Sequence, residues 1–264
     1  MSGLMPLAIE ITPGEHPERH LFGLTFNIDT IISTLVAGSI VILLGFLVRR
    51  ALTKNPADHV PTKLQLIWEG VVGEVNRQVE DNLGKVHPFV APLAISLFFF
   101  ILIANWLEVI PTHLNHDAHL LPPPTADTNL TYAMAFFAVV SVWVYGIRQN
   151  GLGYFKHFVQ PFPVLLPLNI LEELVKPITL ALRLFGNIFA GGIMLALIAA
   201  IPWYAGMPIA NILWKTFELF IGGLQAFIFA LLTVLYFAMA SGGHGDEEHD
   251  EHAENKEKTP ELAT

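Results

Sequence analysis

The chain has 264 residues, of which 53% are hydrophobic and 14% are charged, and its mean hydropathy is +0.53. A chain with this small share of polar side chains cannot cover the surface of a soluble domain of its length. The composition therefore excludes a soluble globular protein. The net charge of -9 offers no basic patch for nucleic acid, and the absence of cysteine excludes disulfides and thiolate chemistry. The composition predicts an all-α polytopic membrane protein.

The first half of the chain predicts three spans of ordinary length and one helix that lies on the membrane. A spanning helix needs about 20 mainly apolar residues. Between the first two spans, apolar residues recur at helical spacing opposite a polar face, which is typical of an amphipathic interfacial helix. In chain order, the predicted segments are an extracytoplasmic N-terminal segment at 1–29, a span at 30–48, the interfacial helix at 60–84, a span at 88–111, an outer loop at 112–128 and a span at 129–147.

Two longer apolar stretches follow, at 167–201 and 209–241. A helix of such length extends for about 50 Å, against a hydrocarbon core of about 30 Å, so we expect each helix to tilt strongly or to break. These two helices bring the expected number of transmembrane helices to about five. The remaining residues, 242–264, form an acidic stretch of low complexity that we expect to be a disordered cytoplasmic tail.

The loops predict the orientation of the chain. Lysines and arginines follow the first and third spans, whereas residues 112–128 and 202–210 contain neither. Because positive residues collect in cytoplasmic loops, the N-terminus is predicted outside and the C-terminus in the cytoplasm.

Arg183 lies in the run 178–201, which contains no other charged residue. An arginine near the bilayer centre costs about 2.5 to 3.5 kcal/mol on insertion scales, which favours a functional role. No acid lies three or four residues away, so its own helix supplies no partner. A guanidinium stays protonated, so it cannot relay a proton, but it can force a nearby carboxylate to release one. The alternative that the residues leave open is a structural ion pair inside the helical bundle.

Both long helices carry a polar stripe. The first stripe consists of Lys176, Thr179, Arg183, Gly186, Asn187, Ala190 and Gly191, and the second of Asn211, Lys215, Glu218, Gly222, Gln225 and Thr233. If the turn between the helices centres near Ala205, Arg183 and Gln225 fall at nearly the same depth, and Glu218 lies farther outward. The two stripes can therefore face each other.

The motif LRLFGNIFAGG at 182–192, with KPITLALR before it and LQAFIFALLTVLYF at 224–237, resembles the a subunit of bacterial F-type ATP synthases. The resemblance extends to FILIANWLEVIP at 100–111, PTADTNLTYAMAF at 124–136 and IRQNGLGYF at 147–155, so it covers most of residues 88–241.

This resemblance implies a stator subunit in the bacterial plasma membrane, with no nucleotide site of its own. A ring of c subunits, each with one carboxylate in mid-membrane, would turn against the two long helices. Two offset half-channels would reach the ring from opposite sides, and Arg183 would separate them. In the family's pattern Arg183 matches the essential arginine, Asn187 its motif partner and Gln225 the glutamine opposite. The other implied partners are b-type peripheral stalk subunits and the F1 catalytic sector.

The chain departs from the family's pattern at two positions. Many bacterial relatives have a glutamate where this chain has Gly192, and some have a histidine where it has Glu218. A single outer acid, Glu218, is therefore expected to replace a pair. Supplementary candidates for the inlet path are Glu108, His113, His116, His119 and Asp127, and candidates for the exit path are Glu172 and Glu173.

Other readings of the same residues remain. A self-contained secondary transporter would use Arg183 to bind an anionic substrate, although no internal repeat supports that architecture. An intramembrane hydrolase is a weaker alternative, because the predicted spans contain no Ser-His or HExxH arrangement. His113, His116 and His119 lie in a proline-containing loop, where their spacing has no helical meaning, so neither a metal site nor a cofactor is predicted.

Overall fold

A computed structural model of the protein describes residues 18–21, 24–53, 63–84, 88–107, 113–115, 118–119, 123–151, 153–154, 163–202, 204 and 206–241. The chain divides into two compact units, each of which is described separately. Unit 1 contains the described residues of Met1–Val60, Ser96–Phe136 and Val175–Phe229, and unit 2 those of Pro61–Ile95, Phe137–Leu174 and Ala230–Thr264. Four helices cross from one unit to the other.

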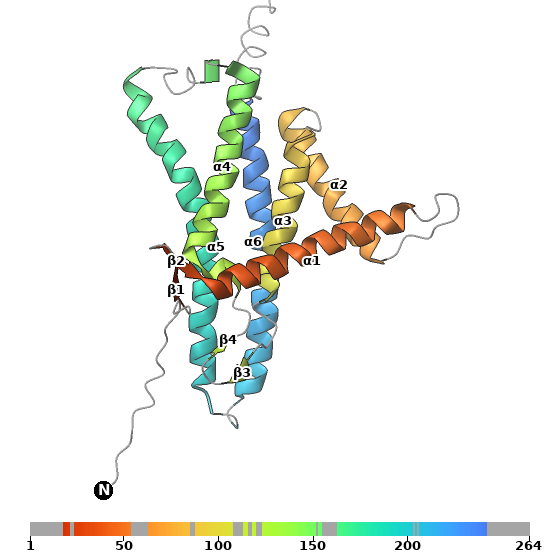
Figure 1. Cartoon of the computed structure of the whole chain (residues 1–264), viewed down its shortest axis with the longest axis vertical. Coiled ribbons are helices and arrows are strands. Elements are labelled where there is room, and N and C mark those ends of the chain that lie inside the picture. The colour runs from red at the N-terminus through yellow and green to blue at the C-terminus, as the bar shows by residue number, and fades with distance from the viewer. Residues whose placement is uncertain are drawn as a thin grey trace, which may run out of the picture. The chain divides into compact units, whose positions relative to one another are not determined.

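Helices dominate the described residues, which confirms the all-α class (Figure 1). The α-helices are α1 (Ile28–Thr53), α2 (Lys63–Leu83), α3 (Val90–Trp106), α4 (Thr128–Asn150), α5 (Leu166–Ala199) and α6 (Met207–Ala240). Short 3-10 turns, η2 (Pro124–Ala126) and η4 (Pro163–Leu165), precede α4 and α5. Two antiparallel pairs complete the order, β1 (Glu18–Leu21) with β2 (Leu24–Asn27) and β3 (His113–Asn115) with β4 (Ala118–His119).

Four of these helices, α1, α4, α5 and α6, are long and apolar enough to cross a membrane. The fifth apolar helix, α3, has only 17 residues and extends for about 26 Å. The described α-helix ends at Trp106, and residues 108–112 at the end of the predicted stretch 88–111 lie outside the described residues. The described chain is thus a polytopic membrane protein with four full-length spans and one shorter apolar helix.

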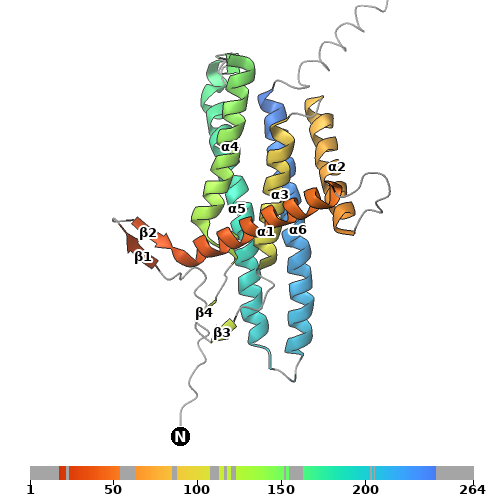
Figure 2. The same ribbon diagram turned by 45° about the vertical axis from the view of Figure 1, so that its right-hand side comes forward.

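The two last helices have 34 residues each, about 51 Å of helix. Pro177 lies inside α5, where it removes one backbone donor, yet the helix continues through it. The turn that joins α5 to α6 contains Gly206, whose φ of +101° is a left-handed conformation that favours glycine. The carbonyl of Gly206 accepts the first hydrogen bond of α6, from the amide of Ala210 at 3.0 Å. Figure 2 shows the segment of α5 that leads into this turn and the segment of α6 that leads out of it.

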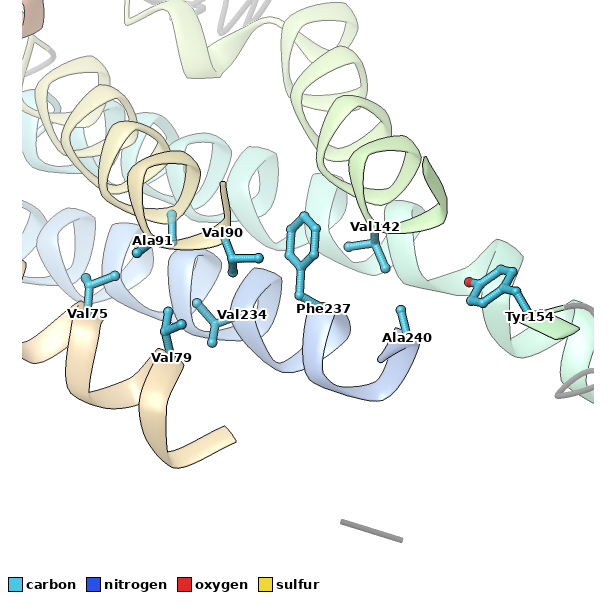
Figure 3. Packing of buried hydrophobic residues seen from close by; sticks show 10 residues of the cluster. Val75, Val79, Val90, Ala91, Val142, Tyr154, Val234, Phe237 and Ala240 are labelled. Carbon is cyan, nitrogen blue, oxygen red and sulfur yellow. The ribbon is translucent and has the colours of Figure 1, made fainter. Parts of the chain in front are cut away.

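The main core of unit 2 joins α2, α3, α4 and α6 (Figure 3). Phe237 of α6 is fully buried, and its ring meets Phe89 and Tyr145 edge-on, with centroids 6.1 and 5.2 Å away. Val75 and Val79 give α2 a buried apolar side, whereas Ile67 remains 64% exposed. One side of α2 is therefore fixed by packing, and the other remains available to the membrane interface.

Candidate functional site

Arg183 lies on the exposed side of α5 in unit 1. Leu180, Ala181, Leu184 and Ile188 bury the other side of the helix at spacings of three and four residues. This amphipathic spacing fixes the direction of the arginine, because position 183 lies outside the arc of the helix that these four residues cover. Within the described residues, Arg183 takes part in no hydrogen bond or ion pair.

Small residues surround Arg183 on the exposed side of α5. Gly186 and Ala190, three and seven residues later, are exposed, and a Cβ at Gly186 would meet nothing within 4 Å. Asn187, one turn after the arginine, is half-buried. Because these neighbouring residues are small, another helix can approach the guanidinium closely.

Glu218 and Gln225 of α6 are buried in unit 1, with only 8% and 7% of their surfaces exposed. Both carboxylate oxygens of Glu218 and the Nε2 atom of Gln225 have no hydrogen-bond partner among the described residues. The same holds for Oδ1 of Asn211 and Nε1 of Trp214, which share this side of α6. Buried polar atoms are normally paired with protein or water, so this side of α6 has an unusual concentration of unsatisfied groups.

The end of α3 holds α6 between these two residues. Asn105, only 4% exposed, donates from Nδ2 to the carbonyl of Gly222 at 3.0 Å. Trp106 donates from Nε1 to the carbonyl of Leu219 at 3.2 Å. Sequence reasoning missed both residues, although they lie in the segment 100–111 that resembles the family. The available signal in the sequence was an asparagine near the end of a predicted apolar helix, where a polar side chain needs a hydrogen-bond partner.

The two polar stripes differ in exposure, and their facing each other stays a prediction. Most of the stripe on α5 is exposed, whereas Glu218, Gly222 and Gln225 are buried. No hydrogen bond or ion pair in the described part of the chain joins Arg183 to Glu218 or Gln225.

Asp127, a candidate for the inlet path, is buried and forms the N-cap of α4. Its Oδ1 accepts a hydrogen bond from the amide of Asn129 at 2.8 Å, and its Oδ2 accepts from Asn27 at 2.7 Å and Thr30 at 2.9 Å. The contact with Asn129 satisfies a donor at the start of α4. The contacts with Asn27 and Thr30 tie the start of α1 to the start of α4. An open groove of about 440 Å³ lies against the same carboxylate and is lined in part by Thr34 of α1.

The two exit-path candidates lie at the start of α5, in unit 2. Glu172 is exposed, whereas Glu173 is half-buried and accepts a hydrogen bond from Nε1 of Trp143 at 2.6 Å. Burial, together with the negative charge of Glu173, raises the pKa of Tyr154 to about 12. The Tyr154 ring lies against Gly146, where a Cβ would come within 2.5 Å of Cε2. Tyr154 is therefore neutral at physiological pH, and Glu173 is held in place by α4.

The remaining candidates are only partly described. Glu108 and His116 lie outside the described residues. His113 and His119 are backbone partners in the β3–β4 pair, while their side chains lie outside the description.

Comparison with known proteins identifies the family of the chain. The family model described as ATP synthase A chain matches residues 31–238. A protein named ATP synthase subunit a from Acidothermus cellulolyticus is 46% identical over 262 residues, covering 98% of this chain and 93% of the relative. A protein of the same name from Mycobacterium tuberculosis is 45% identical, and the match covers 92% of this chain and 98% of the relative. A third protein of this name, from Desulforamulus reducens, is 33% identical, and the match covers 86% of this chain and 84% of the relative.

The matched region contains α3, α4, α5 and almost all of α6, and so includes Arg183, Glu218, Gln225 and Asn105. Both the extent of the match and the identity to full-length relatives exceed what a shared membrane composition would produce. The chain therefore belongs to the ATP synthase A chain family, as a multi-pass membrane subunit.

Proposed function

We propose that this chain is the proton-translocating stator of a rotary ATP synthase, with Arg183 as its electrostatic gate. The observation that carries the proposal is that Arg183 is exposed on a mainly apolar side of α5, next to small residues. In the described part of the chain it has no ion-pair partner. An arginine at membrane depth needs a negative partner. A carboxylate on a ring of c subunits supplies one when the ring packs against this surface.

The charge of Arg183 explains how a proton leaves the ring. At an effective dielectric constant of about 20, two unit charges 4 Å apart attract by about 4 kcal/mol, which corresponds to about three pKa units. A ring carboxylate that reaches the guanidinium therefore releases its proton. Because Arg183 itself stays charged, no proton passes straight from one half-channel to the other.

The buried side of α6 supports an aqueous path from the outside. Glu218 and Gln225 lie seven residues apart, about 10.5 Å along the helix. Their unsatisfied polar atoms, with those of Asn211 and Trp214, suit a file of water molecules that ends beside the ring. Asn187, one turn after Arg183, is assigned to the same translocation site, and Glu172 and Glu173 to the exit path.

The remaining parts of the proposal concern the surroundings of the subunit. The chain resides in the bacterial plasma membrane, with its N-terminus outside, and α5 and α6 lie tilted along the c ring. Peripheral stalk subunits of b type hold it against rotation, and the F1 sector uses the torque. Each proton that crosses the potential supplies about 2.3 kcal/mol per 100 mV.

Purification in a mild detergent tests the proposed assembly. The chain is expected to elute with an oligomeric ring of small subunits and with a peripheral ATPase, because Arg183 and its surface require the ring. A self-contained transporter would elute alone and retain substrate exchange after reconstitution. That result would contradict the stator assignment.

A further inference from the structure

Two sets of buried hydrogen bonds lie in unit 1, one between α3, η2 and α6 and the other around Asp127, two residues after Thr125. Asn105 of α3 donates to the carbonyl of Gly222 and accepts from Oγ1 of Thr125 at 2.9 Å. Thr125, in η2, is fully buried, and two residues later Asp127 bonds to Asn27 and Thr30. The side chain of Asn105, itself bonded to Thr125, thus joins the end of α3 and η2 to one carbonyl on α6.

We propose that Asn105 and Thr125 are positioning residues for the translocation path, an inference that rests on the proposed function. They hold the segment of α6 between Glu218 and Gln225 at a fixed depth and rotation. Neither residue exchanges a proton in this account. Their effect reaches the path through the backbone of α6.

The geometry of α6 makes Gly222 the effective point of contact. At about 100° per residue, positions 218, 222 and 225 lie within about 60° of one another around the helix. Gly222 lies roughly midway between the other two, so a shift at its carbonyl moves both side chains together. Rotation of this segment would therefore change the direction of Glu218 and Gln225 at once.

The missing side chain at Gly222 allows this close approach. A Cβ at that position would lie 3.1 Å from the Cβ of Asn105, and a Cβ at the adjacent Gly223 would lie 3.7 Å from Cδ1 of Leu102. Trp106 adds a second hydrogen bond one turn earlier, to Leu219. The two helices are thus in contact through backbone and short side chains, which leaves little room for rotation.

Variants at the two positions test the proposal in vesicles, with ATP synthesis normalised to the amount of assembled complex. Asn105→Ala is expected to lower proton-driven synthesis about tenfold, since displacements of about 1 Å can cost up to about 10²-fold. Thr125→Val keeps the side-chain volume and is expected to lower synthesis about threefold. The matched control is Ser141→Ala, whose hydroxyl bonds within α4 to the carbonyl of Phe137, and it should stay within about twofold of the parent rate.

A disulfide distinguishes positioning from folding and from direct proton transfer. The chain has no cysteine, and the Cβ positions of residues 105 and 222 need to separate by only about half an ångström to accept a disulfide. In the double variant Asn105→Cys/Gly222→Cys, oxidation after assembly should restore at least half of the parent synthesis, and reduction should remove it. Neither single variant should respond.

The proposal is overturned if Asn105→Ala and Thr125→Val both synthesise ATP at the parent rate, or if the disulfide forms without restoring synthesis. If Asn105→Ala does not assemble, Thr125→Val and the double variant decide the question. Arg183→Ala in the same vesicles separates this result from failure of the proposed function. Activity in that variant would contradict the stator assignment itself, whereas its inactivity leaves only the positioning role under test.

Discussion

Replacing Arg183 with alanine is expected to abolish proton-driven ATP synthesis in membrane vesicles. Without the guanidinium, nothing favours the charged form of the ring carboxylate by the roughly 4 kcal/mol estimated above, so the proton stays bound. Nothing then separates the two half-channels either, so passive proton leak through the assembled complex should rise. Both quantities are measured on the same vesicles, as ATP formed and as the decay of an imposed pH gradient.

Two further variants sharpen this prediction. Arg183→Lys keeps the charge but loses the planar group of five donors, and it should restore only a small fraction of synthesis. Arg50→Ala makes the same change of side chain in the last turn of α1, where it should leave synthesis near the parent rate. Parent-like synthesis by Arg183→Ala would show that the gate lies elsewhere.

Replacing Glu218 with glutamine is expected to slow synthesis by about tenfold or more without abolishing it. Glutamine has the same shape as glutamate but cannot release a proton, so the outer path loses the buried acid on α6 while water can still reach the ring. Because the neutral amide is easier to bury than a carboxylate, the variant should assemble well. Initial rates of ATP synthesis at several imposed pH gradients measure the effect.

The matched control for this change is Glu74→Gln on α2. Hydrogen bonds from Gln78 and Arg77 lower the pKa of the Glu74 carboxyl, so it is ionised at neutral pH, and it belongs to unit 2, whereas Glu218 belongs to unit 1. Its replacement should leave the rate unchanged. An unchanged rate in Glu218→Gln would remove that residue from the path.

Local pattern was sufficient to predict the helices. Apolar runs gave the two 34-residue helices to within a few residues, because helix length in a membrane follows directly from composition. The end of the span predicted at 88–111 stays a prediction, because α3 is described as far as Trp106 and residues 108–112 lie outside the described residues.

Contacts between distant segments could not be predicted in the same way. Asp127 was a candidate for the inlet path, and the sequence did not indicate that its carboxylate accepts hydrogen bonds from Asn27 and Thr30, which lie 100 and 97 residues away. The exposed position of Arg183 and the buried position of Glu218 likewise depend on which helix covers which face. Periodicity defines the faces of a helix but does not identify the neighbour of each face.

Cysteine cross-linking along α5 tests the central claim most directly, because this chain contributes no background thiol. Single cysteines at the exposed positions Leu182, Gly186 and Ala190 are combined with a cysteine next to the ring carboxylate, and Ala181 and Leu184 serve as buried controls. The account predicts cross-links between subunits from the exposed positions and none from the buried controls. Cross-links absent from all three exposed positions in an assembled, active complex would contradict it.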